Sequence, residues 1–97
     1  MASYLSLINW TDQGIRNVKD AGKRIDNFKK AVEAAGGRVI FFYMVMGEYD
    51  LATLIELPDD AAAARVLLET ARLGNIRSKT LRAFTEEETR TLTSGLS

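Results

Sequence analysis

The segment RVIFFYMVM, residues 38–46, constrains the fold of this chain more than any other stretch. Its β-branched, aromatic and other apolar residues favour a β-strand. With strict alternation, one face carries Val39, Phe41, Tyr43 and Val45, and the other carries Ile40, Phe42, Met44 and Met46. Because both faces are apolar, the strand requires cover on both sides.

Gly47 and Glu48 follow this strand and turn the chain into a second strand over residues 49–57. Glycine suits a tight hairpin because it adopts positive φ without steric cost. The reversal excludes an all-parallel sheet. In the second strand we expect one side to face the helices, with Leu51, Thr53, Ile55 and Leu57, and the other to carry Ala52, Leu54 and Glu56.

Two helical segments separate the strands. Residues 20–35 carry apolar side chains at steps of three and four, which predicts an amphipathic helix that Gly36 and Gly37 end. The apolar stripe begins upstream of this helix and comprises Ile15, Val18, Gly22, Ile25, Phe28, Val32 and Ala35. Residues 61–73 follow Pro58 and an aspartate cap, and their expected apolar face comprises Ala64, Leu67, Leu68 and Ala71.

Two further strands complete the order β-α-β-β-α-β. Residues 3–10 and 76–84 read as strands, with Thr11 as a helix cap after the first. Short connections then predict an α+β, ferredoxin-like fold in one domain over residues 1–97, with an antiparallel sheet in the order 4-1-3-2 and both helices on one face. Residues 85–97 are expected to form a short C-terminal helix, begun by a capping box at Thr85, and a frayed tail.

Composition excludes several classes of function. The chain has no cysteine and no histidine, so thiol nucleophiles and imidazole bases or ligands are excluded, and we expect neither a metal nor a cofactor. Lys+Arg and Asp+Glu both number 13, and this zero net charge argues against a nucleic-acid partner. No apolar run approaches the roughly 18 residues that span a membrane. The N-terminus lacks a basic leader region, so we expect a cytoplasmic protein.

The predicted topology gathers unusual polar residues at one edge of the sheet. The end of the first strand, the hairpin and the start of the last strand meet there, which brings together Trp10, Thr11, Tyr49, Asp50 and Arg77. Polar groups around a small apolar cavity are typical of a ligand site. The alternative is structural: Asp50 then bonds a backbone N–H, Tyr49 and Trp10 pack, and Arg77 is solvated.

Three segments resemble the GYD domain family of small bacterial and archaeal proteins. The segments are TDQGIRNVKDAGKRIDNFKKAVEAAGG, YMVMGEYDLATLIELPDD and GNIRSKTLRAF. The resemblance as a whole covers roughly residues 4–88. The Gly-x-Tyr-Asp motif that names the family is Gly47-Glu48-Tyr49-Asp50 here. The resemblance implies a dimeric α+β barrel, in which two ferredoxin-like sheets face each other, and it implies no particular activity.

Two functions fit these observations. The first is a non-catalytic, self-associating module that binds a ligand or builds an assembly. Two helices cover only one face of the sheet, so an uncovered apolar face predicts a homo-oligomer, a dimer or higher. The alternative is a cofactor-independent enzyme, isomerase-like or monooxygenase-like, with a cavity between sheet and helices. Asp50 would then act as base, and Tyr49 or Arg77 would stabilise an oxyanion.

Overall fold

The computed structural model describes all residues from Met1 to Ser97. The elements follow the predicted order, with two short helical turns inserted after the first strand. They are β1 (Ala2–Trp10), α1 (Asp12–Arg16), the 3-10 turn η1 (Val18–Asp20), α2 (Ala21–Ala34), β2 (Arg38–Met44), β3 (Leu51–Leu57), α3 (Asp60–Ala71), β4 (Ile76–Ala83) and α4 (Glu86–Ser94).

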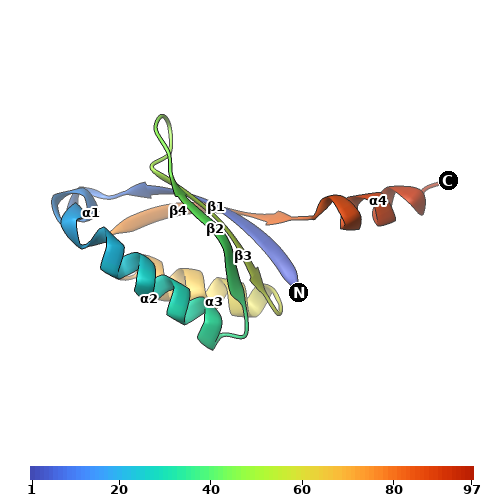
Figure 1. The fold of residues 1–97 in the computed structure, drawn as a ribbon, viewed down its shortest axis with the longest axis horizontal. Helices are drawn as coiled ribbons and strands as arrows, with labels where there is room; N and C mark the ends of the chain where they lie inside the picture. The colour runs from blue at the N-terminus through green and yellow to red at the C-terminus, as the bar shows by residue number, and fades with distance from the viewer.

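The four strands form one antiparallel sheet in the order β2-β3-β1-β4, which is the predicted order 4-1-3-2 read from the other edge. Helices α2 and α3 lie beside each other beneath one face of this sheet (Figure 1). No helix in the structure combines the length and the apolar character that crossing a membrane requires.

The core lies between this face and the two helices. Register places Tyr4 opposite Ile55 and Ile8 opposite Leu51, and all four side chains are buried. Phe28 and Val32 of α2 pack in one cluster with Tyr4 and Ile55, as predicted for this helix. Helix α3 adds Ala63 and Val66 to the cluster. The predicted division of β3 is also confirmed, because the residues on its helix side are buried and those on its other side are half-buried.

The predicted helix stripes are wrong at five positions. Val18, in the turn η1, and Gly22, in the first turn of α2, are both exposed. Ile15 is 48% exposed because it lies in α1, which the turn η1 separates from α2. Leu68 is 69% exposed and Ala64 is also exposed, since α3 turns Ala63 and Val66 to the sheet instead. The orientation of α3 is set at its first turn. There Asp59 accepts a hydrogen bond from the N–H of Ala62, and Asp60 Oδ1 accepts one from the Tyr4 hydroxyl at 2.5 Å.

Strand β2 does not alternate as predicted, because it contains a β-bulge. Val39 lies opposite Ile55, but the next partners are Phe41 and Leu54, so Ile40 is an extra residue. A bulge of this kind re-aims the residues that follow it. Val39 and Phe42 therefore both face the helices, whereas Phe41 and Tyr43 share the opposite face.

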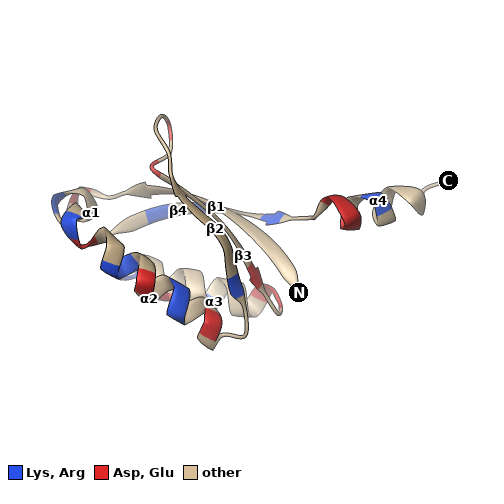
Figure 2. Ribbon diagram, in the orientation of Figure 1, with Lys and Arg blue, Asp and Glu red and all other residues tan.

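Two segments project from the body of the molecule. The tip of the β2–β3 hairpin extends on the side away from the helices, and α4 extends beyond the end of β4 (Figure 1). Helix α4 begins with a capping box, in which the Thr85 N–H donates to Glu88 Oε1 at 2.8 Å and thereby lowers the pKa of Glu88. Charged residues lie mainly along the helices and toward the strand ends (Figure 2).

Candidate functional site

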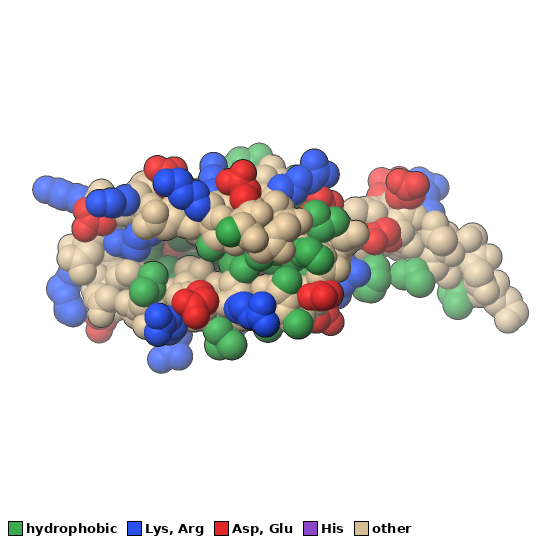
Figure 3. All heavy atoms as spheres, turned by 90° about the horizontal axis from the view of Figure 1, so that it is seen from below, with side chains coloured by type: hydrophobic (Ala, Val, Ile, Leu, Met, Phe, Trp, Pro, Cys, Tyr) green, Lys and Arg blue, Asp and Glu red, His purple; other side chains and the backbone are tan.

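A cavity of about 180 Å³ opens between α2 and α3. Viewed from the helix side, it is a hollow with hydrophobic side chains in its depth (Figure 3). The sheet supplies the floor, including Ile8, Trp10, Phe42, Leu51 and Ile76. The walls are Ile25, Phe28 and Ala31 of α2 and Leu67, Thr70 and Leu73 from α3 and the turn that follows it.

Small residues in the middle of the sheet leave room for this cavity. Ser6 and Thr53 lie opposite each other on the helix face and are fully buried, and Ser78 follows on the edge strand. Their hydroxyls need partners because a buried polar group without one is destabilising. Ser6 Oγ bonds Thr80 Oγ1, and Thr53 Oγ1 donates to the carbonyl of Phe41 at 2.8 Å. The hydroxyls of Ser6 and Thr53 are therefore satisfied within the sheet, and no bulky side chain at these positions fills the space.

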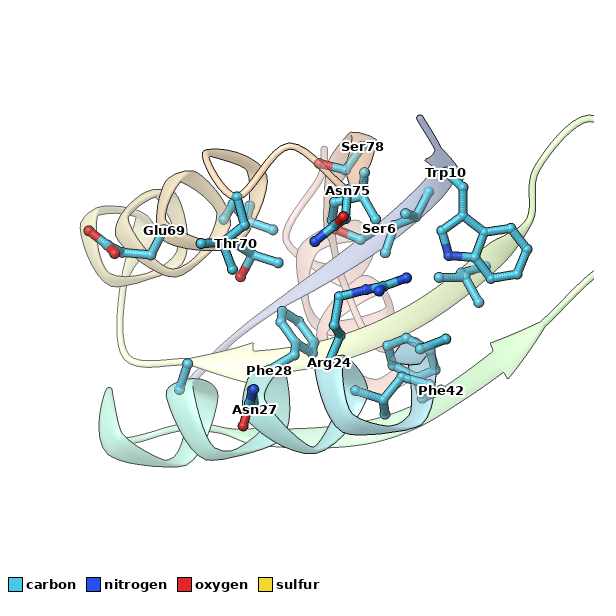
Figure 4. Close-up of a pocket in the computed structure, with 18 residues that line it drawn as sticks. Ser6, Trp10, Arg24, Asn27, Phe28, Phe42, Glu69, Thr70, Asn75 and Ser78 are labelled. Carbon is cyan, nitrogen blue, oxygen red and sulfur yellow. The ribbon is translucent and has the colours of Figure 1, made fainter. Parts of the chain in front are cut away.

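Arg24 supplies the one cationic group in the cavity lining. It reaches from α2 across the opening, with Asn75 on the opposite side and Trp10 at one end (Figure 4). Its Nη1 donates to the carbonyl of Asn17 at 3.0 Å and its Nη2 to the carbonyl of Gly14 at 3.3 Å. Arg24 takes part in none of the chain's three ion pairs, so its charge is not neutralised by a carboxylate.

Of the five residues predicted to form a site, Trp10 lines this cavity and Thr11 supports its edge. Thr11 is the cap of α1, and its Oγ1 accepts from the N–H of Gly14 at 3.1 Å and donates to the carbonyl of Gly74 at 2.6 Å. Gly14 lies so close to Asn75 that a Cβ there would be 2.0 Å from the Asn75 carbonyl oxygen. These contacts fix α1 against the turn before β4.

The other three predicted residues lie away from the cavity lining. Asp50 Oδ2 accepts from the Trp10 N–H at 3.0 Å and from Asn9 Nδ2 at 3.4 Å, which ties the hairpin to the end of β1. The Tyr49 ring lies 5.8 Å from Lys79 Nζ, and Arg77 is an exposed residue of β4. Asp50 thus contacts Trp10 through its backbone, and a ligand role for this group stays a prediction.

The face of the sheet opposite the helices carries a continuous apolar row. Strand register places four residues side by side across all four strands, in the order Phe41, Leu54, Leu5 and Leu81. The adjacent row contains Tyr43, Ala52, Leu7 and Lys79. No helix of the chain covers this face (Figure 1).

The chain exposes more surface than a compact monomer of its size. Its accessible surface is 6700 Å². A folded monomer of 10.8 kDa is expected to expose about 5,500 Å². The radius of gyration is 14.6 Å, against about 13 Å for a compact domain of this length. The surface excess of about 1,200 Å² is larger than one partner's share of a standard interface, about 800 Å², and the projecting hairpin and α4 contribute to it (Figure 1).

A sequence profile of the GYD domain matches residues 4–93. This chain belongs to the GYD domain family. The GYD protein is 32% identical over 85 residues to a Thermus thermophilus protein named glutamine synthetase and cystathionine beta-lyase binding protein. The aligned residues make up 87% of this chain and 90% of the relative. It also resembles the crystal structure of TTHA0845 from Thermus thermophilus, with a TM-score of 0.56 and 26% identity over 88% of this chain and 95% of that one.

Sequence reasoning on this GYD domain missed Arg24 and Asn75 as cavity residues. Arg24 lies outside the apolar stripe that the periodicity predicts for its helix, and Asn75 follows Gly74 in the turn after α3. One signal was available, because Arg24 precedes Phe28 by four residues and therefore lies on the same helix face. What positions its guanidinium, however, is the turn at Asn17, which no periodicity indicates.

Proposed function

We propose that this GYD domain is a self-associating binding module, in which the helix-free face of one sheet packs against the same face of a second copy. The observation that carries this proposal is the apolar row across all four strands. Two such sheets, each covered by its own helices on the outside, would enclose the row between them as a dimeric α+β barrel.

The projecting hairpin supports the same arrangement. Met46 is 92% exposed and lies between β2 and β3, in the hairpin that rises on the helix-free side (Figure 1). A second copy on the sheet face would also lie against this hairpin. Unbranched methionine side chains adapt readily to such a contact. Burial of the sheet face by the partner would then account for part of the surface excess of the single chain.

We further propose that the assembled module binds other proteins and does not catalyse a reaction. The Thermus thermophilus relative is named for its binding of two enzymes, which supports protein binding as the function of this chain. The cavity lining offers a single carboxylate, Glu69, and this is paired with Arg72 at 3.2 Å. A paired, exposed carboxylate is a poor candidate for a general base.

Cysteine cross-linking tests the facing-sheet arrangement, because the chain has no native cysteine. Leu5→Cys and Leu54→Cys place a thiol on the apolar row, and Ala64→Cys places one on the exposed side of α3 as the matched control. A short bismaleimide should join the two row variants into covalent dimers and leave Ala64→Cys largely monomeric. Equal cross-linking of all three variants would contradict the proposal.

Protein binding is tested separately with purified glutamine synthetase from the organism that encodes this chain. Immobilised wild-type chain should bind it measurably at micromolar concentration, and a variant that remains a monomer should bind less. Wild-type chain that is folded and oligomeric but binds no such enzyme would remove the protein-binding part and leave the self-association intact.

A further inference from the structure

The cavity between α2 and α3 joins an apolar interior to a cationic opening. We propose that it binds a small carboxylate whose apolar body is about the size of one aromatic ring. The apolar body would lie among Ile8, Phe28 and Leu67, and the carboxylate would meet Arg24.

The volume of the cavity sets the size of the ligand. About 180 Å³ is available, and an engineered protein cavity of roughly 150 Å³ takes up benzene. Sites for drug-sized ligands begin at about 300 Å³. One ring, or a branched aliphatic group of similar bulk, with a short acidic substituent therefore fits the available space.

The hydrogen bonds of Arg24 set the charge of the ligand. A guanidinium has five N–H donors in a planar fork, and such a fork suits a carboxylate. The structure satisfies two of these donors, with the carbonyls of Asn17 and Gly14, and these two bonds also hold the side chain in place. The group is half-buried and pairs with no acid of the chain, so an anionic ligand would supply the missing partner.

The surroundings of Arg24 place the carboxylate at the boundary between an apolar and a polar compartment. A second hollow, lined by polar residues alone, adjoins the cavity and shares Arg24, Asn27 and Asn75 with it. This hollow contains Lys23 and also Asp20, and neither forms an ion pair. A carboxylate at Arg24 would thus keep contact with water and with the amide of Asn75, while the apolar body leaves water.

The site is separate from the self-association surface, since the cavity lies on the helix side of the sheet. Trp10 lines it and is the only tryptophan of the chain, so its fluorescence reports on occupancy. Phenylacetate, phenylacetamide and phenethylammonium share one ring and nearly one shape but differ in charge. They can be titrated against the protein by Trp10 fluorescence, with ligand-observed NMR as an independent measure.

We expect wild-type protein to bind phenylacetate at least about tenfold more tightly than phenylacetamide, and phenethylammonium most weakly. Arg24→Gln should remove the difference between acid and amide, whereas Arg24→Lys should keep part of it. Arg65→Gln, an exposed arginine of α3 outside the lining, is the matched control and should bind like wild type. Ser78→Leu fills the floor without removing a charge and should weaken all three probes.

Equal affinity of wild-type protein for acid and amide would overturn the proposal, as would no detectable binding of phenylacetate at millimolar concentration. An acid preference that persists in folded Arg24→Gln would overturn it too. If Arg24→Gln lowers the melting temperature so far that the protein is unfolded, the wild-type comparison and Ser78→Leu decide the matter. Unchanged phenylacetate binding in Ser78→Leu would place the ligand elsewhere.

Discussion

Phe41 and Tyr43 stack on the helix-free face of the sheet, with ring centroids 5.0 Å apart and an angle of 19° between the planes. Alternation puts both rings on one face of β2, and the bulge at Ile40 makes this the helix-free face, opposite to that of Val39. Tyr43 remains 62% exposed in the single chain. Phe41 belongs to the apolar row and Tyr43 to the row beside it, and aromatic residues are enriched at protein interfaces.

The Tyr4 hydroxyl should make stability depend on alkaline pH. Burial first, and then the hydrogen bond to Asp60 and the charge of that carboxylate, raise the pKa of Tyr4 from 10.0 to about 12. The folded state thus holds the proton more tightly than the unfolded state. The stabilisation from this group is complete below pH 10 and is lost as pH rises toward about 12.

Denaturant unfolding of wild type and Tyr4→Phe across this range isolates the effect, because the other titrating groups are common to both proteins. The difference in unfolding free energy between the two should shift in favour of Tyr4→Phe above pH 10. Parallel curves for the two proteins would show that the hydroxyl is not held as the structure describes.

Truncation of Phe28 tests the packing of α2. The ring is 8% exposed and meets Phe42 edge to face, with centroids 6.2 Å apart. Phe28→Ala should destabilise the fold by about 3–5 kcal/mol. Leu68→Ala, on the exposed side of α3, should change stability by no more than about 0.5 kcal/mol. Similar losses in chemical denaturation for both variants would contradict the helix register.

Two glycines of the first helical region should respond oppositely to alanine. At Gly14 a Cβ would lie 2.0 Å from the backbone oxygen of Asn75, so Gly14→Ala must displace α1 or the turn before β4. At Gly22, in α2, a Cβ meets nothing within 4 Å. Gly22→Ala should therefore stabilise by about 0.5–1 kcal/mol. Calorimetry should show a lower melting temperature for the first variant and a slightly higher one for the second.

Asp50 distinguishes a structural role from a ligand role. Its Oδ2 accepts the Trp10 N–H at 3.0 Å. Asp50→Asn keeps an acceptor oxygen and should cost about 1 kcal/mol or less, whereas Asp50→Ala leaves that N–H without its partner and should cost about 1–3 kcal/mol. Equal melting temperatures for the two variants, or loss of ligand binding in Asp50→Asn at wild-type stability, would indicate a different role for the carboxylate.

The strand order and most element positions could be predicted because they follow from local patterns. The change from alternation to helical spacing after Trp10, and the glycines that end α2, indicate boundaries without tertiary information. The bulge could not be predicted in this way. In RVIFFYMVM every candidate face is apolar, so the pattern cannot show that Ile40 is unpaired and that Phe41 and Tyr43 face away from the helices.

The candidate site was predicted less well. The topology determines which residues lie at one edge of the sheet, but it does not determine on which face of the sheet each side chain lies. Trp10 and Arg77 lie near the same edge, but Trp10 lines the helix-side cavity and Arg77 does not. The charge at the cavity mouth depends on Arg24 bonding the carbonyls of Gly14 and Asn17, and that contact arises from the break between α1 and α2. Such a contact leaves no periodic signal.

Sedimentation equilibrium at micromolar concentration tests the self-association claim most directly. The wild-type protein should have a mass at least twice that of the 10.8 kDa chain. Leu54→Glu places a charge in the middle of the apolar row and should yield the mass of one chain, while Leu68→Glu, on the exposed side of α3, should keep the wild-type mass. A wild-type protein that sediments as one chain, or a folded Leu54→Glu variant with unchanged mass, would contradict the account.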